Sequence, residues 1–290
     1  MVRPLSRSRR PPRPPCAHPL VIAHRGASSE VAEHTLPAYL QAIEDGADGL
    51  ECDVRLTRDG HLVCVHDRTV NRTSNGQGIV SELDLSGLES LDFQSWHDDL
   101  PASADELLEQ PYLAGVAPDR LAPGSPTVLT LENLLSVVAD TDRPVKLLIE
   151  TKHPTRYGGL VEQELVRMLR RFGWAGDAEA EHRVTIMSFA SVALRRVRLL
   201  APAVPLVLLL DRASLLRRAG TLPAGVHTAG PGIGALRSEP SYAERVHAAG
   251  NRVYCWTVDE PADVELVHEL GVDAIITNRP RQVRGQLGYA

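Results

Sequence analysis

The sequence LVIAHRGASSEVAEHTLPAYLQAIEDGADGLECDV, residues 20–54, contains a strand, a helix and a second strand in that order. The runs Leu20–Ala23 and Gly49–Val54 are rich in apolar residues without alternation, which is typical of strands buried on both faces of a parallel sheet. Between them, Thr35 can cap a helix at its start and Gly46 can end it. This unit predicts an α/β protein.

The same order of elements recurs to the end of the chain. Helical patterns lie between several later apolar runs, for example at about 160–172, after Ser191 and from Pro261 to Leu270. The later strand candidates are Leu62–Val65, Val145–Ile149, Val184–Met187, Leu206–Leu210, Val226–Thr228, Arg252–Trp256 and Ala274–Ile276. About eight strand–helix repeats in 290 residues predict a closed (β/α)₈ barrel, the TIM-barrel architecture.

Three places depart from this rhythm. The nine strand candidates are one more than the barrel needs, and we expect Val226–Thr228 to be a loop. The link from Asp53 to Leu62 is too short for a helical crossover, so a hairpin or a link without a helix must fill that step. Residues 84–126 are polar and contain proline, which predicts a small insertion after the third strand, over one mouth of the barrel.

The composition favours one large domain with a short tail. A chain of 290 residues, 43% of them hydrophobic, can bury a sizeable core, and we expect a single barrel domain over residues 18–290. Residues 1–17 are basic and rich in proline, which is typical of a disordered tail. Prolines occupy the apolar stretch that a twin-arginine signal at Arg9-Arg10 or a lipoprotein signal at Cys16 would need. The sequence therefore predicts a cytoplasmic protein.

Charge and cysteine usage argue against several other classes. The formal net charge of −6 differs from the basic footprint of a nucleic-acid or membrane-surface binder. No apolar run approaches the length of a membrane span, so we expect no stable membrane insertion. The four cysteines form no CxxC pair and mostly lie in apolar runs, which indicates small buried side chains rather than disulfides or a zinc site.

Acidic side chains recur at the ends of two predicted strands. Residues two apart on a strand point the same way, so Glu51 and Asp53 project together. Glu150 and Lys152 repeat this spacing after the run Val145–Ile149. Three carboxylates suit Mg²⁺ or Ca²⁺, and Lys152 can attract a phosphate oxygen. Taken alone, each pair is more often exposed or a simple ion pair.

Two histidines and an arginine accompany these acids. His24 and His66 each follow an apolar strand, and histidine can give or take a proton near neutral pH. Cleaving a phosphodiester needs a base for the attacking oxygen and an acid for the leaving alkoxide. Arg25 can bridge two phosphate oxygens, which lysine cannot do. A lone histidine is usually structural, but two at successive strand ends beside acids predict phosphate-ester cleavage.

A series of short motifs follows a fixed order along the chain: HRG (His24–Gly26), ECDV (Glu51–Val54), TRDG (Thr57–Gly60), HD (His66-Asp67), RTSNGQG (Arg72–Gly78), Glu89–Asp92, IETK (Ile149–Lys152), SF (Ser188-Phe189), WTVD (Trp256–Asp259) and GVDAIITNRP (Gly271–Pro280). In this order they resemble the glycerophosphodiester phosphodiesterase family. Single motifs such as HRG are weak signals. The ordered set is very specific and covers about residues 20–280.

The resemblance implies a phospholipase-C-like TIM barrel that hydrolyses glycerophosphodiesters to glycerol 3-phosphate and an alcohol. A proposed family route has a neighbouring glycerol hydroxyl attack phosphorus, after which water opens the cyclic phosphate. The resemblance implies general acid–base catalysis by His24 and His66, a divalent cation (Mg²⁺ or Ca²⁺) on Glu51, Asp53 and Glu150, and phosphate binding by Arg25 and Lys152.

The sequence departs from the family pattern at two places. The usual PENT is here Ala32–Thr35, which retains Glu33 as a possible orienting group and places His34 in the same region. The usual TDxP is here Thr277–Pro280, which removes one acid, and we expect tuning rather than loss of activity. Two aromatic residues at the mouths of later strands could pack against the glycerol carbons or belong to the barrel core: Phe189 and Trp256.

Three other functions compete with this hypothesis. A lysophospholipase D would need the insertion to offer an apolar groove, for which there is only a modest supply of residues: Tyr112, Leu113, Leu121 and Val128. A catalytically silent barrel would be expected to have lost a histidine or a metal-type acid. An isomerase that uses a barrel phosphate site would not need two histidines beside three metal-type carboxylates. We expect a small-molecule substrate, while the head-group alcohol, the cation, the order of the two histidines and the oligomeric state stay open.

Overall fold

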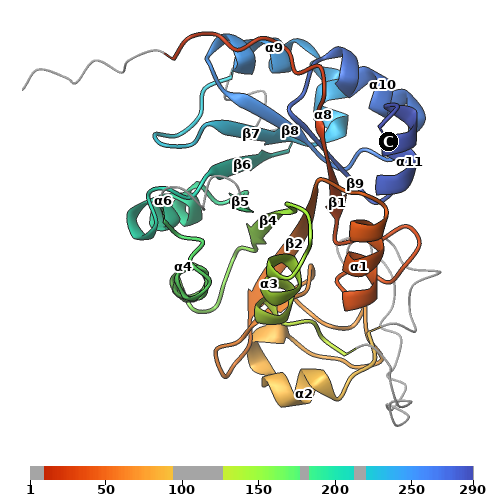
Figure 1. Ribbon diagram of the computed structural model, residues 1–290. Helices are drawn as coiled ribbons and strands as arrows, with labels where there is room; N and C mark the ends of the chain where they lie inside the picture. The colour runs from red at the N-terminus through yellow and green to blue at the C-terminus, as the bar shows by residue number, and fades with distance from the viewer. Residues whose placement is uncertain (1–9, 94–126, 177–182, 212–219, 290) are drawn as a thin grey trace, which may run out of the picture.

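The structure is a computed structural model that describes residues 10–93, 127–176, 183–211 and 220–289. Within these ranges, eight parallel strands form a ring in which β1 pairs with both β2 and β9 and so closes it (Figure 1). The strands are β1 (Leu20–His24), β2 (Gly49–Leu56), β4 (Lys146–Thr151), β5 (Val184–Ser188), β6 (Leu206–Leu210), β7 (Thr228–Pro231), β8 (Arg252–Cys255) and β9 (Ala274–Thr277). The predicted TIM barrel is confirmed.

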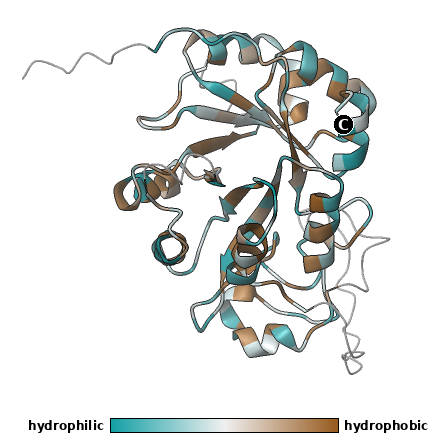
Figure 2. Ribbon diagram, viewed as in Figure 1, coloured by the Kyte–Doolittle hydropathy of each residue, from teal (hydrophilic) through white to brown (hydrophobic). Residues whose placement is uncertain are grey.

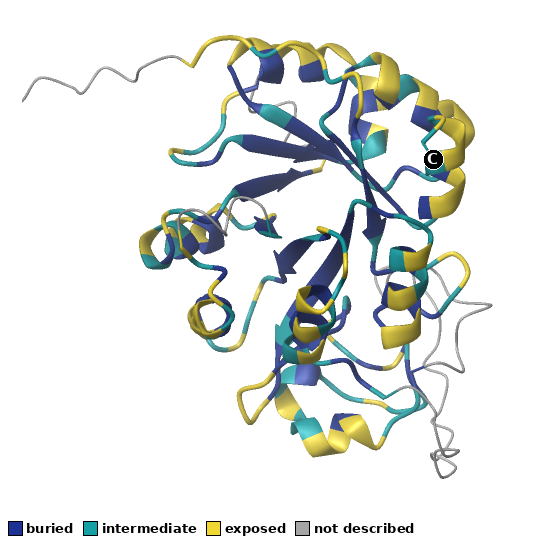
Figure 3. Cartoon of the chain, viewed as in Figure 1, coloured by how far each residue is buried: buried dark blue, intermediate teal, exposed yellow. Residues whose placement is uncertain are grey.

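Helices cover the outside of this ring and turn their exposed sides to solvent (Figure 3). The first begins as predicted, because the Thr35 hydroxyl accepts a hydrogen bond from the Ala38 amide. The covering helices are α1 (Leu36–Glu44), α3 (Leu131–Ala139), α4 (Leu160–Arg171), α6 (Ser191–Leu200), α8 (Ile233–Ser238), α9 (Ser241–Ala248), α10 (Pro261–Glu269) and α11 (Pro280–Gln286). Each buries an apolar stripe against the strands.

The extra strand lies elsewhere than the sequence suggested. β3 (Leu62–Cys64) pairs antiparallel with the end of β2, which confirms the expected hairpin. Val226 and His227 belong to a loop, as predicted, but Thr228 begins β7, so the expectation that this run contributes no strand was wrong. β7 lacks large apolar residues because its neighbour fills the space: a Cβ on Gly230 would lie 2.8 Å from Leu209.

The chain after β3 forms a small body beside the barrel. It contains the 3₁₀ turn η1 (Val80–Glu82) and α2 (Leu85–Glu89). An apolar cluster of its own holds it together, made of Val63, Val65, Val70, Val80, Leu88, Phe93 and Val128. The predicted insertion at 84–126 is described only as far as residue 93, since 94–126 lie outside the described residues.

Alternate residues of the strands point into the barrel, whose walls are predominantly hydrophobic (Figure 2). The interior is filled by Ile22, Leu148, Met187, Val207, Leu209, Tyr254, Ala274 and Ile276. His24 follows Ile22 by two positions, and Glu150 follows Leu148 in the same way. Polar side chains therefore form a layer above this apolar filling, at the carboxyl ends of the strands, where TIM barrels hold their active sites.

Part of the predicted tail contacts the opposite end of the barrel. The amide of Cys16 donates to the Gly271 carbonyl at 2.9 Å, and the Arg13 guanidinium lies 3.2 Å from Asp273. Residues 1–9 lie outside the described residues, so the boundary at residue 17 stays a prediction. In the described part of the chain, no helix combines the length and apolar character needed to span a bilayer.

Candidate active site

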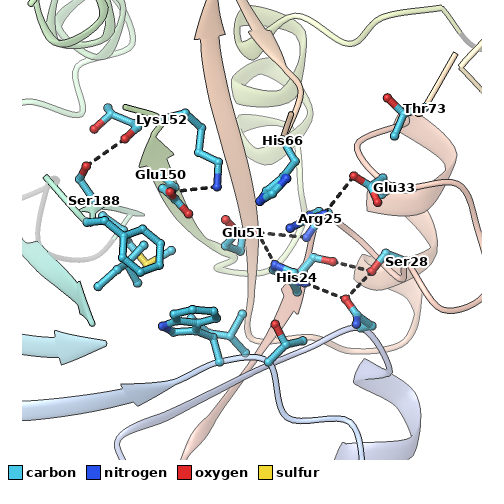
Figure 4. Close-up of a pocket in the computed structure, with 18 of the residues that line it drawn as sticks. His24, Arg25, Ser28, Glu33, Glu51, His66, Thr73, Glu150, Lys152 and Ser188 are labelled. Atoms are coloured by element: carbon cyan, nitrogen blue, oxygen red, sulfur yellow. Dashed lines mark hydrogen bonds and ion pairs between the residues drawn. The ribbon is translucent and has the colours of Figure 1, made fainter. Parts of the chain in front are cut away.

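A cavity of about 720 Å³ opens above the polar layer (Figure 4). Asp53 is 1% exposed and lies behind the cavity wall. The other predicted site residues all line the cavity: His24, Arg25, Glu33, Glu51, His66, Glu150, Lys152, Phe189 and Trp256. Side chains that are up to 232 residues apart in the sequence therefore meet at one mouth of the barrel.

Three buried carboxylates come together at the floor of the cavity. Each of Glu51, Asp53 and Glu150 offers an oxygen, and these atoms lie within 4.8 Å of one another. Burial, together with the charge of Asp53, raises the pKa of Glu51 well above its usual range, and burial raises that of Glu150 to about 7. The cluster thus lacks the positive charge that would let all three ionise. A divalent cation with a preference for oxygen ligands fits this set.

Lys152 supplies part of the missing charge. Its ammonium nitrogen lies 3.1 Å from Asp53 Oδ1 and 3.0 Å from Glu150 Oε1. Burial lowers the pKa of Lys152, but the two carboxylates outweigh it and the net shift is upward. The ion pair between Glu150 and Lys152 therefore coexists with the acidic cluster.

Arg25 reaches the same carboxylates through a tight turn. Its φ of 58° is left-handed, and a Cβ on the next residue, Gly26, would lie 2.7 Å from Ala38, so only glycine fits there. The turn lets the Arg25 amide donate to Glu51 Oε2 at 3.1 Å, while the guanidinium Nε lies 3.2 Å from Asp53. The guanidinium is thereby fixed at the cavity wall.

A chain of ion pairs connects Arg25 with His66. Glu33 accepts from Arg25 at 3.1 Å and from both terminal nitrogens of Arg72, at 2.8 and 2.6 Å. Arg72 Nε donates to Asp67 at 2.6 Å, and the other Asp67 oxygen lies 2.7 Å from His66 Nδ1. Glu33 therefore links the two arginines, and its orienting role stays a prediction. Asp67 and Arg72 were not predicted as site residues, although both lie in the quoted motifs.

His24 has a neutral partner. Its Nδ1 lies 2.7 Å from Asn278 Oδ1. The amide group of Asn278 donates to Asp259 at 2.7 Å, which leaves its oxygen facing His24, so Nδ1 of His24 carries the proton. Nε2 is then an acceptor, 4.0 Å from Glu51. Burial, followed by the charge of Arg25, lowers the pKa of His24 to about 3.

His66 and the two aromatic residues complete the cavity. Burial lowers the pKa of His66, while the charge of Asp53 and the hydrogen bond that His66 makes to Asp67 oppose that shift. Phe189 and Trp256 meet edge to face, with ring centroids 5.4 Å apart. Phe189 is 46% exposed, so it is not part of the barrel core, whereas Trp256 also packs against the inner apolar cluster.

Comparisons with known proteins agree with this arrangement. A relative from Bacillus subtilis named glycerophosphodiester phosphodiesterase is 32% identical over 266 residues, 90% of this chain and 84% of its own. Among solved structures of similar fold are a glycerophosphodiester phosphodiesterase of Agrobacterium tumefaciens (TM-score 0.70, 22% identity, 92% of this chain and 100% of that one) and a phosphodiesterase of Oleispira antarctica in complex with the product sn-glycerol-3-phosphate (TM-score 0.69, 21% identity, 93% and 97%).

Two further matches identify the family. A relative from Mycobacterium tuberculosis, named as a probable glycerophosphodiester phosphodiesterase, is 45% identical over 271 residues, 93% of each chain. The family model described as the glycerophosphoryl diester phosphodiesterase family matches residues 24–282. These residues run from the first histidine of the cavity to the last helix of the barrel, and the chain belongs to the glycerophosphoryl diester phosphodiesterase family.

Proposed function

We propose that this enzyme hydrolyses glycerophosphodiesters to glycerol 3-phosphate and an alcohol, with a divalent cation, Mg²⁺ or Ca²⁺, held by Glu51, Asp53 and Glu150. One observation carries the proposal: three carboxylates that can share a cation gather at the floor of the cavity, where Glu51 and Glu150 line it together with two imidazoles. The names of the relatives and the product bound to the Oleispira antarctica phosphodiesterase support the choice of substrate.

The different partners of the two histidines support different roles. His24 presents an unprotonated Nε2 to the cavity, as a general base requires. The Asp67 carboxylate beside Nδ1 of His66 stabilises an imidazolium, as a general acid requires. We therefore assign the base to His24 and the acid to His66.

The proposed reaction has two balanced steps. In the first, His24 takes the proton of a neighbouring glycerol hydroxyl, whose oxygen bonds to phosphorus while the alcohol leaves with a proton from His66. In the second, His66 takes a proton from water, which bonds to phosphorus, and His24 returns its proton to the departing glycerol oxygen. Both histidines end in their starting states.

The remaining residues bind and orient the substrate. Arg25 and Lys152 are positioned to neutralise phosphate oxygens, and Phe189 with Trp256 forms an apolar wall for the glycerol carbons. When bound, a divalent cation neutralises phosphate charge and favours the in-line geometry of an attacking hydroxyl. Of the residues named for a lysophospholipase D groove, Val128 is buried in the apolar cluster of the small body, and the others lie outside the described part of the chain, so this alternative stays a prediction.

The test is product release by purified, metal-stripped protein. Glycerophosphocholine with Mg²⁺ or Ca²⁺ should yield glycerol 3-phosphate, and EDTA should stop turnover reversibly. Glu51→Gln is the matched control for the cation site, because it keeps the size of the side chain but removes a carboxylate from that site. Choline release from lysophosphatidylcholine without any glycerol 3-phosphate would favour the alternative instead. Full activity in EDTA would overturn the metal assignment.

A further inference from the structure

His34 stands in the loop that joins β1 to α1, directly before the helix cap Thr35. It is buried, with 5% of its surface exposed, and its φ of 60° is left-handed. Its amide donates to the Arg25 carbonyl at 3.0 Å, which ties this loop to the end of β1. Among the described residues that line the cavity His34 does not occur, so it lies behind the site rather than in it.

Both ring nitrogens of His34 have polar partners. Nε2 lies 2.9 Å from Asp53 Oδ2, and Nδ1 lies 2.8 Å from the Tyr39 hydroxyl. A carboxylate only accepts, so Nε2 carries the proton. In the neutral ring Nδ1 can accept the single hydroxyl proton of Tyr39 at 2.8 Å, in competition with the Glu51 carbonyl oxygen at 3.2 Å. The shorter contact favours His34, and Tyr39 then supports the tautomer that His34 needs to donate to Asp53.

These contacts divide the two oxygens of Asp53 between different tasks. Oδ2 faces His34, with the Arg25 Nε at 3.2 Å on the same atom. Oδ1 lies 3.1 Å from Lys152, whose ammonium also contacts Glu150 of the acidic cluster. Contacts to Oδ2 restrict rotation of the carboxylate, so Oδ1 stays on the side of Lys152 and Glu150.

We propose that His34 is a positioning residue for Asp53: its Nε2–H holds the carboxylate so that Oδ1 is presented to the divalent cation. Partners of this kind orient metal ligands and tune metal affinity without touching the ion. The inference rests on the cation site of the proposed function and adds a residue to it.

Two substitutions separate this role from a merely structural one. The amide nitrogen of His34→Gln can occupy the place of Nε2 and keep the donor to Asp53. His34→Asn can reach only the place of Nδ1 and loses that donor, but asparagine tolerates left-handed backbone better than glutamine. If His34 served only the turn, Asn would therefore be the better replacement. If it positions Asp53, Gln would be.

The experiment measures Mn²⁺ binding to the full-length, metal-free protein by calorimetry, with the melting temperature taken on the same samples. We expect the Kd for Mn²⁺ to rise about 10–100-fold in His34→Asn and less than about threefold in His34→Gln, the range typical of groups that orient metal ligands. Glutamine should also restore kcat at saturating Mn²⁺. An unchanged Kd in His34→Asn, or equal losses in both variants, would overturn the proposal.

Tyr39→Phe provides a test that leaves His34 and the backbone in place. It removes the hydroxyl that supports the tautomer, and we expect a smaller rise in the Mn²⁺ Kd than in His34→Asn. No rise would overturn the role of Tyr39.

Failure of the proposed function can be distinguished from failure of the role proposed for His34. Wild-type protein that binds Mn²⁺ but releases no glycerol 3-phosphate overturns the proposed function and leaves the role of His34 standing. Wild-type protein that binds none of Mn²⁺, Mg²⁺ and Ca²⁺ overturns both.

Discussion

The two histidines of the cavity are held by different kinds of structure. His24 ends a barrel strand, and its partner Asn278 follows β9, the neighbouring strand in the ring. His66 lies in the segment that follows β3. Its partner is the next residue, Asp67, which also accepts a hydrogen bond from Arg72. One imidazole is thus positioned by the barrel itself and the other by a network of ion pairs beside it.

This difference matters for chemistry because the partners differ in charge. A neutral amide oxygen orients His24 and stabilises its protonated form less than a full negative charge would, whereas a carboxylate stabilises the imidazolium of His66. The same side chain can therefore serve as base on one side of the phosphate and as acid on the other. The predictions below test this asymmetry.

The largest expected effect is a dependence on the leaving group. With an alkyl alcohol, both His24→Ala and His66→Ala should lower kcat by about 10²–10⁴-fold, as loss of a general base or acid does. With a p-nitrophenyl ester of glycerol phosphate, whose leaving group needs no proton, His66→Ala should recover most of the rate of p-nitrophenol release in the first turnover, and His24→Ala should not. Single-turnover kinetics of both variants on both esters provides the measurement, because His66 is needed again as the base of the second step. The opposite pattern would exchange the two roles.

A smaller effect is expected when the charge beside His66 is removed. Asp67→Asn keeps the shape of the partner but replaces a charged hydrogen bond, which contributes about 1.5–3 kcal/mol and so corresponds to about 10–150-fold in kcat. Without the carboxylate the pKa of His66 falls, so the acid loses its proton at lower pH and the alkaline limb of the rate profile should move to lower pH. A profile with an unmoved alkaline limb would remove His66 from the role of acid.

Replacing the neutral partner of His24 by a charged one should move the acid limb of the pH–rate profile. Asn278→Asp places a carboxylate beside Nδ1, which raises the pKa of His24 above its low value of about 3. The base is then protonated over a wider range, so the acid limb of kcat/KM should rise by about 1–3 pH units.

A double variant controls for the clash of two acids at this position. Asp259→Asn combined with Asn278→Asp exchanges acid and amide but keeps a donor between the two side chains, since Asn278 now donates to Asp259. It should show the same shift of the acid limb as the single variant. An acid limb that stays in place in both would contradict the assignment of His24 as base.

The sequence predicted the barrel and the strand-end residues well because both depend on local patterns. Apolar runs and the two-residue period of strands place Glu51, Asp53 and Glu150 toward the barrel interior at the same end. β7 was not predicted from its sequence because its residues are small and form no apolar run. Leu209 of the neighbouring strand β6 fills the space beside them. That compensation between strands leaves no signal in either run alone.

Partners of the site residues were harder to predict for a similar reason. The link between His24 and Asn278 spans 254 positions, and only the closure of the ring brings the two together. His34 is visible in the sequence as an exchange of residue type, but its contact with Asp53 depends on a left-handed turn. Most of the cavity-lining residues are thus predictable from strand order, whereas the groups that contact them from behind depend on loop geometry.

The smallest expected effect concerns the hydroxyl that supports the His24 side of the comparison. Ser28 Oγ lies 2.7 Å from the His24 carbonyl oxygen and 2.8 Å from Asn278 Oδ1. Its single proton supports an amide that Asp259 already orients, so Ser28→Ala removes about one neutral hydrogen bond, or about 0.5–1.5 kcal/mol. We expect kcat to fall by about 2–10-fold with the pH profile unmoved, because no charge beside His24 changes. A shift of the acid limb in Ser28→Ala would mean that the hydroxyl, rather than the amide of Asn278, sets the protonation of His24.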